Sequence, residues 1–438
     1  MTALPPPSAR FFDEAVETMP RGALRDHQEA LLLELLPHAY EHAPLVRHAW
    51  DAAGVHPRDV RDLDDFCALA PFVSKDAIRR YRDGSTDPFG GVLAVPLAEL
   101  TAVMSTSGTT GDPTLVPEQW GRGRGPAALS RDFWGMGVRP GDHVALVLFT
   151  FRGPTYGFVQ GMGGIPVLFD FDPAEMERFC EASLEYRPTG LYNFGSALIR
   201  AVADACDRRG FDPVDVFSSY RGVVFAGEPL GRRSRELAEA WGIELFEHTG
   251  VGDVTYAFEC GEHDGLHFWE DTVFVECLTP DGDEPVADGG RGELVATTLF
   301  NRVAPFVRFR SDDLVRVTRA PCACGRTHAR LWPIGRKSDE VVVDGRSVLP
   351  VDVWDAIESV DASAAGLFQV VRSSTTADRL QLRVGYAPQF ATRLDAVADE
   401  VRDAVVAAVG VDVAVELVPD DALLRLGPPH KIPRVAGA

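Results

Sequence analysis

The stretch that decides the fold runs from Met104 to Pro117 and reads MSTSGTTGDPTLVP, with six hydroxyl side chains and two glycines. Hydroxyl groups and free backbone amides donate hydrogen bonds, and glycine lets the backbone bend tightly and approach a ligand. A loop of such donors suits the oxygens of a polyphosphate, although it lacks the Gly-Lys-Ser/Thr ending of a Walker loop. Taken alone, the composition favours an ordinary surface turn, so the other motifs of the chain decide between the two interpretations.

The composition limits the classes of protein to which the chain can belong. Its 438 residues suffice for two or three domains, and its net charge of −22 argues against a binder of nucleic acids or anionic membranes. We expect no signal peptide, because the N-terminus lacks a basic start and an apolar core, and no apolar run is long enough to span a bilayer. Seven cysteines then predict cytosolic thiols or metal ligands rather than disulfides. We therefore expect a cytoplasmic protein.

Apolar runs alternate with helical patterns through much of the chain. Residues 11–43 predict helix, with breaks at Pro20 and Pro37. Buried strands are predicted by three short runs rich in Val, Leu and Phe, at residues 143–149, 164–170 and 221–225. The lengths between them fit crossover helices, so the pattern predicts an α/β fold with mostly parallel sheets, which bind ligands at the carboxyl ends of their strands.

The pattern changes after residue 266. Residues 267–278, 292–299 and 307–318 alternate apolar and polar side chains, which predicts an antiparallel, barrel-like part. The last hundred residues or so follow the order strand, helix, strand, strand, helix, strand. This order predicts a small α+β domain at the C-terminus, of a common domain size.

Residues 106–114 read TSGTTGDPT and resemble the loop SSGTTGKPT of the adenylate-forming, acyl-CoA synthetase-like superfamily, in its phenylacetate–CoA ligase branch. The segments HAY at 38–40, AGVHP at 53–57 and APFVSKD at 70–76 resemble the N-terminal region of the same branch. Asp112 replaces the usual lysine, which implies a weaker hold on the triphosphate or more reliance on Mg²⁺. The resemblance implies that the β- and γ-phosphates of ATP are bound by a loop containing Ser105, Thr106, Ser107, Gly108, Thr109 and Thr110.

Two motifs at predicted strand ends extend the resemblance to the nucleotide. Residues 226–229, AGEP, resemble the family's GAEP turn, which flanks the adenine and here contains Gly227, Glu228 and Pro229. Without the resemblance, this stretch fits a strand-to-helix turn equally well. Residues 249–253, TGVGD, stand where the family has YGLSE or YGLTE, whose tyrosine lies on the adenine and whose glutamate binds Mg²⁺. Thr249 thus replaces the aromatic ring, whereas Asp253 keeps a carboxylate for Mg²⁺, which accepts either acid.

Three further matches lie in the last third of the chain. Residues 308–314, RFRSDDL, resemble RYRTRDL, whose final aspartate, here Asp313, accepts hydrogen bonds from the two ribose hydroxyls. The tail HKIPR resembles the family ending Gly-Lys-x-x-Arg, so that Lys431 matches the lysine that spans the substrate carboxylate and the α-phosphate. Taken alone, Asp313 fits an exposed strand-end charge and Lys431 a solvated tail residue.

The third match, GRKSDE at residues 335–340, resembles the family hinge GRSDD. It implies that Arg336 contacts a phosphate or the ribose and that Ser338 and Asp339 form the hinge. The boundary divides the chain into a large adenylation domain at residues 1–335 and a small α+β domain at residues 336–438. In the family the small domain rotates between adenylation and thioester formation, which the hinge must absorb.

Two pairs of sulfur and nitrogen donors suggest a metal site. Cys260 and His267 lie in ECGEHDGLH, and Cys322 and Cys324 lie in PCACGRT, each pair in a short turn with glycine. These donors fit a structural, four-ligand zinc site, with His263 as a competing donor, although reduced surface thiols fit the spacing equally well. Some members of the resembled branch carry the same two segments, which favours zinc. We expect small core residues at the remaining cysteines, Cys67, Cys180, Cys206 and Cys277.

The resemblance covers nearly the whole chain and implies an ATP-dependent enzyme that converts a carboxylic acid into an acyl-AMP, releases pyrophosphate and then transfers the acyl group to CoA. Transfer to a carrier protein or an amine remains an alternative on the same fold. A zinc-stabilised nucleotide-binding protein without catalysis is an alternative of another class, because of the replacements at Asp112, Thr249 and Asp253.

The branch favours an aromatic acid as the substrate. Phe149, Phe151 and Tyr156 follow a predicted strand end and are candidates for a flat apolar pocket, or else for the core. The expected ligands are ATP, Mg²⁺, CoA and a structural Zn²⁺, with no nucleic acid or membrane partner. The oligomeric state, a homodimer included, is left open.

Overall fold

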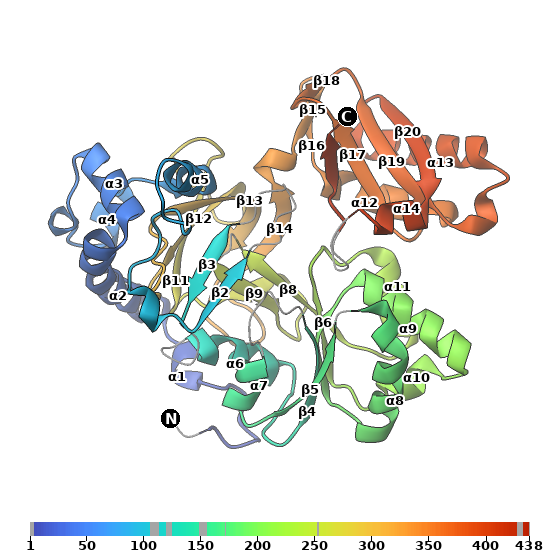
Figure 1. Cartoon of the computed structure of the whole chain (residues 1–438), viewed down its shortest axis with the longest axis horizontal. Helices are drawn as coiled ribbons and strands as arrows, with labels where there is room; N and C mark the ends of the chain where they lie inside the picture. The colour runs from blue at the N-terminus through green and yellow to red at the C-terminus, as the bar shows by residue number, and fades with distance from the viewer. Residues whose placement is uncertain are drawn as a thin grey trace. The chain divides into compact units, whose positions relative to one another are not determined.

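The computed structural model of the chain describes residues 4–105, 114–119, 125–148, 156–170, 172–251, 254–426 and 432–437 (Figure 1). It has the predicted α/β fold, with a large mixed sheet and a smaller C-terminal α+β part. The chain divides into two compact units: unit 1 holds Met1–Leu168 and His248–Pro333, and unit 2 holds Phe169–Glu247 and Ile334–Ala438. Each described helix is too short or too polar to span a lipid bilayer.

Unit 1 begins with four helices, namely α1 (Glu14–Glu17), α2 (Arg21–His42), α3 (Pro44–Ala53) and α4 (Leu63–Leu69). The predicted break at Pro20 is confirmed, because Pro20 stands at the N-cap of α2. The predicted break at Pro37 is wrong, because α2 continues through it. An internal proline costs about 3 kcal/mol, whereas each buried leucine contributes about 1.5–3 kcal/mol. Leu24, Leu32, Leu35 and Leu36 are all buried, so packing outweighs the lost hydrogen bond.

A succession of strands in unit 1 follows the order β11-β12-β13-β14-β10-β9-β8. Their bounds are β8 (Leu245–Val251), β9 (Thr255–Glu259), β10 (Leu266–Phe268), β11 (Val273–Leu278), β12 (Arg291–Thr298), β13 (Phe309–Thr318) and β14 (Arg330–Arg336). The antiparallel pattern is confirmed, for example in the pairs β8–β9, β9–β10 and β11–β12. Residues 267–278 form two strands rather than one, because a turn closed by the Thr272 N–H and the Trp269 carbonyl separates β10 from β11.

The remaining elements of unit 1 surround the stretch from Met104 to Pro117. The antiparallel strands β2 (Ala102–Ser105) and β3 (Leu115–Glu118) flank its central residues 106–113, which lie outside the described residues. The other elements are β1 (Val73–Ser74), which pairs in parallel with β13, α5 (Lys75–Asp83), α6 (Gly125–Gly135), β4 (His143–Leu148), α7 (Tyr156–Gly161) and β5 (Ile165–Asp170). The strands predicted at residues 143–149 and 164–170 correspond to β4 and β5.

The first part of unit 2 contains the parallel strands β6 (Gly190–Phe194) and β7 (Gly222–Ala226). Its helices, coloured green in Figure 1, are α8 (Met176–Tyr186), α9 (Ser196–Arg209), α10 (Pro213–Phe217) and α11 (Arg232–Ala240). Strand β7 was predicted from the sequence and β6 was not. The pairing of β6 shifts register between Leu191 and Phe194, and Asn193 has a φ of 71°, so this strand lacks a regular alternation.

The second part of unit 2 is an α+β arrangement, but its order differs from the predicted one: two strands rather than one precede its first helix, three strands rather than two follow that helix, and a further helix and strand follow the last predicted strand. Its elements are β15 (Val341–Val343), β16 (Arg346–Val348), α12 (Pro350–Glu358), β17 (Phe368–Arg372), β18 (Thr376–Ala377), β19 (Leu380–Tyr386), α13 (Leu394–Val409), β20 (Val413–Pro419), α14 (Asp420–Leu424) and β21 (Val435–Gly437). Two sheets form, in the orders β16-β15-β18 and β20-β19-β17-β21. A valine-rich core between residues 341 and 413 joins α12 and α13 to these sheets.

Candidate metal centre and nucleotide site

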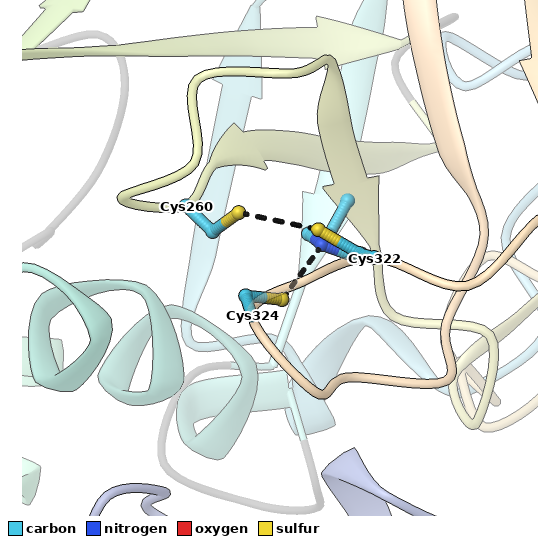
Figure 2. A group of neighbouring side chains, drawn as sticks. Cys260, Cys322 and Cys324 are labelled. Carbon is cyan, nitrogen blue, oxygen red and sulfur yellow. Dashed lines mark hydrogen bonds between the residues drawn. The ribbon is translucent and has the colours of Figure 1, made fainter.

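The structure brings together the four residues predicted as metal ligands. One ligand atom each from Cys260, His267, Cys322 and Cys324 lies within 4.8 Å of the others, and all four residues are buried. Figure 2 shows the Cys260 side chain, from the loop after β9, pointing toward Cys322 and Cys324 on the loop that precedes β14. His267 lies in β10, which pairs with both β9 and β14. Neighbouring strands therefore place the two predicted pairs of donors side by side.

The spacing of these atoms fits a tetrahedral metal ion. Zinc–sulfur bonds of about 2.3 Å place two sulfurs about 3.8 Å apart, and a sulfur and a nitrogen about 3.5 Å apart. The Cys260 and Cys322 sulfurs are 3.8 Å apart, and the Cys324 sulfur lies 3.3 Å from His267 Nε2. A disulfide would need about 2.05 Å between sulfurs. The donor set therefore fits zinc and does not fit a disulfide.

A hydrogen bond at Nδ1 of His267 sets the tautomer and orientation of the imidazole ring. His267 Nδ1 lies 3.0 Å from the backbone carbonyl oxygen of His328, which can only accept a hydrogen bond. Nδ1 therefore carries a proton, and Nε2, the atom that faces Cys324, is the ring nitrogen that a metal ion could bind. Metal-binding histidines almost always have such a partner, which sets the tautomer and the ring orientation.

Cys260 and Cys324 differ in their pKa. A hydrogen bond from Cys260 is the largest cause that lowers the pKa of Cys324 to about 2; burial acts in the opposite direction, and His267 lowers the pKa further. The pKa of Cys260 is raised by its hydrogen bond to Cys324 and by burial. Cys324 is therefore the sulfur held as a thiolate, the form that binds metals.

Glycines shape the two turns that carry the cysteines. Gly265 has a φ of 83°, and an added Cβ would lie 2.7 Å from the Trp332 ring, so only glycine fits there. Gly325 has a φ of 82° and donates its N–H to the Cys322 carbonyl. His263, the competing donor, lies outside the cluster: its Nδ1 is 3.1 Å from a carboxylate oxygen of Glu259.

The loop before β14 also holds the N-terminal segment of the chain. Arg10 donates to the Cys324 carbonyl at 2.8 Å, and the Thr327 N–H donates to the Glu17 carbonyl at 3.1 Å. The Arg326 guanidinium bonds to the fully buried Glu17 carboxylate at 2.8 Å. Burial raises the pKa of Glu17, and Arg326 opposes this effect. Segments about 300 residues apart are thus joined at the proposed metal loop.

A second group of buried charges lies in unit 1. Arg131 makes two bonds to Asp271, at 2.8 and 2.9 Å, and its guanidinium lies 4.7 Å from the Trp269 ring centroid. The Trp269 indole N–H donates to Asp132 at 2.9 Å. Burial raises the pKa of Asp132 well above its usual range, and burial lowers the pKa of His248, 3.9 Å away, to about 4. His248 is therefore neutral at pH 7.

The nucleotide motifs of unit 1 lie on strands. Ser105 ends β2, and Thr249 lies within β8, opposite Ala257 of β9, so the predicted TGVGD motif starts inside a strand rather than after one. Asp313 is half-buried in β13, and its N–H donates to Ser311 Oγ at 3.1 Å. The preceding Asp312 has a φ of 71°, which bends the strand at the predicted ribose residue.

The adenine motif lies in unit 2. Gly227, with a φ of 106°, begins the turn after β7 that continues through Glu228 and the exposed Pro229. The Glu228 carboxylate accepts a hydrogen bond from Arg434 of the tail at 2.8 Å. Glu228 is thus engaged by a residue for which the sequence had suggested no role.

Comparison with known proteins shows to which enzymes the chain is similar. No family model matches the chain. The phenylacetate–coenzyme A ligase of Thermus thermophilus is 31% identical over 409 residues, covering 90% of this chain and 89% of the relative. That of Aromatoleum evansii is 31% identical over 360 residues, covering 76% of each. The crystal structure of a 2-hydroxyisobutyryl-CoA ligase in the postadenylation state, with 2-HIB-AMP, matches with a TM-score of 0.85 and 26% identity, over 100% of this chain and 94% of that one.

The chain belongs to the phenylacetate–CoA ligase branch of the adenylate-forming enzymes. It is an AMP-forming acid–CoA ligase, which joins a carboxylic acid to CoA through an acyl-AMP. The 2-hydroxyisobutyryl-CoA ligase has also been solved with 2-HIB-AMP and CoA in a thioesterification state.

The predicted hinge of this ligase lies at the end of β14 and in the short helix that follows it. Arg336 ends β14, and the short helix Lys337–Asp339 contains Ser338 and Asp339. Arg372 of β17 donates to the backbone carbonyls of Ser338 and Glu340. The domain boundary at residues 335 and 336 stays a prediction, as do the roles of these residues.

Several predicted site residues lie outside the described residues. These are Thr106, Ser107, Gly108, Thr109, Thr110, Asp112, Phe149, Phe151, Asp253 and Lys431. Tyr156 is described; it begins α7 and is 39% exposed. Arg434 was not among the predicted site residues, although the Lys-x-x-Arg spacing of the tail is a signal that points to it.

Proposed function

We propose that this ligase activates an aromatic or arylacetic acid. A carboxylate oxygen of the acid attacks the α-phosphorus of ATP, and pyrophosphate leaves. The CoA thiol then attacks the acyl carbon, loses its proton, and AMP leaves. The observation that carries the choice of acid is the identity of 31% to phenylacetate–coenzyme A ligases over most of the chain.

Different residues of the chain bind the ribose, bind the phosphates and neutralise charge during adenylation. Asp313 receives the ribose hydroxyls with its two carboxylate oxygens, and the residues from Ser105 to Thr110 bind the phosphates. Lys431 neutralises the charge that develops as the carboxylate approaches the α-phosphate. The family's tyrosine position is occupied by Thr249, whose hydroxyl bonds to the Gly250 carbonyl at 3.3 Å, so this position cannot stack on the adenine.

Mg²⁺ would be held through Asp253 and the phosphates of the substrate. Magnesium keeps several waters and commonly binds through one or two carboxylates plus phosphates, so a single aspartate fits its preferences. The ion would supply charge neutralisation at the phosphates. The replacement of lysine by Asp112 leaves more of that neutralisation to the ion.

Zinc would be held by Cys260, His267, Cys322 and Cys324. Four protein ligands leave no open position for water, so the site is structural. The fit rests on the distances between the donors and on the tautomer that His328 imposes on His267. Bound zinc would cross-link the loop after β9 to the loop before β14.

ATP–pyrophosphate exchange with a panel of acids tests the proposed substrate class. We expect exchange with phenylacetate or benzoate at low concentrations, and weaker exchange with acetate and 2-hydroxyisobutyrate. A preference for the small aliphatic acids would reject an aromatic substrate. Consumption of free CoA in the same reactions tests the second step, because transfer to a carrier protein or an amine would leave free CoA unchanged.

A further inference from the structure

Strand β13 is irregular at the residue proposed to bind the ribose, Asp313. It pairs regularly with β12 on both sides of this point, but the register shifts between Glu293 and Val295 of β12. Residues 311–313 of β13 therefore lie opposite Leu294 of β12 alone. Such a β-bulge bends its strand and changes the direction of a side chain, and bulges are common next to active sites.

The bulge removes Asp313 from the buried face of β13. Successive side chains of a regular strand point to opposite faces, so the odd-numbered residues of β13 would share one face. The other members of this set are each at most 2% exposed, namely Phe309, Ser311, Val315 and Val317. Regular alternation would place the Asp313 side chain among them, where a charged group is costly. Asp313 is half-buried instead.

The hydroxyl of Ser311 bonds to both strands at the bulge. Its Oγ donates to the Leu294 carbonyl of β12 at 2.8 Å and accepts the backbone N–H of Asp313 at 3.1 Å. Ser311 is only 2% exposed. Without the hydroxyl, both backbone groups would lose this buried partner, which is unfavourable. One side chain thus connects β12 to the backbone of Asp313.

The residue between Ser311 and Asp313 has a strained backbone. Asp312 has a φ of 71°, in the left-handed region, which few residues other than glycine adopt and which aspartate tolerates better than most. Such conformations persist where the surrounding structure imposes them, and they cluster at functional sites. The two hydrogen bonds of the Ser311 hydroxyl lie on either side of Asp312 and hold this conformation.

An ion pair spans the bulge from one regular pairing to the other. Arg310, which pairs with Val295 before the bulge, donates to the Glu293 carboxylate at 2.9 Å. The two side chains are 15% and 2% exposed. The Arg310 guanidinium carbon also lies 4.3 Å from the ring centroid of Phe72. The ends of the bulge are therefore fixed, and the Ser311 hydroxyl sets the path of the chain between them.

We propose that Ser311 is a positioning residue for Asp313. Its hydroxyl holds the bulge that directs the Asp313 carboxylate at the two ribose hydroxyls, and it thereby sets the preference of the enzyme for ribonucleotides. This inference rests on the proposed function, in which Asp313 receives the ribose. A contact from both carboxylate oxygens to two hydroxyls needs a side chain held within about 0.5 Å. Ser311 is buried and acts through the backbone of Asp313.

The test measures equilibrium binding of AMP and of 2′,3′-dideoxy-AMP, which lacks both ribose hydroxyls, by titration calorimetry. The variants are Ser311→Ala, Ser311→Thr, which keeps a hydroxyl, and Asp313→Ala. The matched control is Ser130→Ala. Ser130 lies in the same unit, is also 2% exposed, and donates its hydroxyl to the Phe158 carbonyl at 3.2 Å. The quantity compared is the dissociation constant for dideoxy-AMP divided by that for AMP.

The hydroxyl at residue 311 should determine this ratio. A hydrogen bond to a charged group is worth at least about tenfold in affinity, so the wild-type ratio should be about 10 or more. Asp313→Ala should reduce the ratio to about 1, and Ser311→Ala should bring it within about threefold of 1. Ser311→Thr and Ser130→Ala should keep the wild-type ratio.

Three results would overturn the proposal. An unchanged ratio in Ser311→Ala would mean that the hydroxyl does not direct Asp313. Equal weakening of both nucleotides would mean a structural role alone, and a low ratio in Ser311→Thr would mean that the hydroxyl is not the group that matters.

A second pair of variants decides if Ser311→Ala does not fold. Asp312→Gly and Asp312→Ala both lose the carboxylate, but only glycine takes a φ of 71° without strain. The ratio should therefore be higher in Asp312→Gly than in Asp312→Ala. Equal ratios would reject the bulge as the device that directs Asp313.

Amide hydrogen exchange gives a readout that needs no nucleotide. Ser311→Ala should speed exchange at the Asp313 N–H, which bonds to the Ser311 hydroxyl, whereas Ser311→Thr and Ser130→Ala should not. Unchanged exchange in Ser311→Ala would reject the role of the hydroxyl in the bulge. If the wild type binds both nucleotides equally, the proposed ribose role of Asp313 fails, and exchange still decides whether Ser311 holds the backbone of Asp313.

Discussion

Removal of the metal from the cluster of Cys260, His267, Cys322 and Cys324 should destabilise unit 1 while leaving unit 2 folded. The four donors come from strand β10 and from the loops after β9 and before β14, and a metal ion bound to them would cross-link these segments. Without an ion, the buried sulfurs and the imidazole of His267 lose the positive charge that would bind all four donors together. The chain near the cluster should then open locally.

The separation of the cysteines sets the size of the effect. Cys260 and Cys322 are 62 residues apart, and a cross-link that closes a loop of this length stabilises by about 4 kcal/mol in the chain-entropy model. For a domain of 150–250 residues, each kcal/mol shifts the Tm by about 2–4 °C. We therefore expect the Tm of unit 1 to fall by about 10 °C.

The assay combines elemental analysis with calorimetry. The purified protein should contain one zinc per chain, and a chelator should remove the zinc and lower the first thermal transition. Cys322→Ser should reproduce the shift without chelator. Cys67→Ala is the matched control, because burial raises the pKa of Cys67 to about 12 and it lies outside the cluster.

The location of the opening gives a second readout. The loop before β14 bonds to Arg10 and to Glu17 through Cys324, Arg326 and Thr327. Amide exchange should therefore rise in α1 and its flanks when the metal leaves. A protein that contains no stoichiometric metal, or one whose Tm and exchange do not respond to chelation and to Cys322→Ser, would refute the reasoning.

Three further changes test other parts of the molecule. Asp132→Asn keeps an acceptor for the Trp269 indole but cannot ionise. Burial raises the pKa of Asp132 above its usual 3.8, so the contribution of the protonated carboxyl to stability is lost as pH rises through the folded-state pKa. The Tm of the variant relative to wild type should therefore increase between pH 5 and pH 8, and a pH-independent difference would contradict this. Lys431→Ala should slow single-turnover acyl-AMP formation by about 10²–10³-fold and spare thioester formation from supplied acyl-AMP; near-normal adenylation would make it an ordinary tail lysine. Asp313→Ala should raise the KM for ATP in pyrophosphate exchange and in the reverse reaction alike, and an unchanged KM would remove Asp313 from the ribose site.

The parts of the fold that the sequence predicted are those with a regular local pattern. The strands β4, β5 and β7 are short apolar runs between polar turns, and the C-terminal part alternates strands and helices with clear boundaries. The metal cluster was predictable for a different reason. Taken alone, the spacing of the cysteines and the histidine fitted reduced surface thiols equally well. The resemblance to a branch in which some members carry the same two segments decided for a metal site before any strand pairing was known.

The parts that the sequence could not predict depend on contacts between distant segments. Helix α2 continues through Pro37 because leucines on its buried face pack against the rest of unit 1. This packing cannot be predicted from the residues next to Pro37 alone. Asn193 has a left-handed φ and lies where the pairing of β6 with β7 shifts register. This irregularity of β6 is not apparent in the sequence. Arg434 appeared as one residue of a terminal motif, and only its contacts with Glu228 and Trp354 show what it holds.

The register of the strands connects the metal cluster to the nucleotide motif on β8. His267 of β10 lies opposite Phe258 of β9, and Phe258 lies opposite His248 of β8. His248 immediately precedes Thr249, the first residue of the TGVGD motif. A slip of one residue in a strand turns every side chain to the other face of the sheet. A metal ion bound by His267 of β10, by Cys260 just after β9 and by the loop before β14 would therefore also fix which face Thr249 presents. Such an ion would leave no position for a substrate, so we expect it to act on adenylation only through the register of the strand that carries the motif.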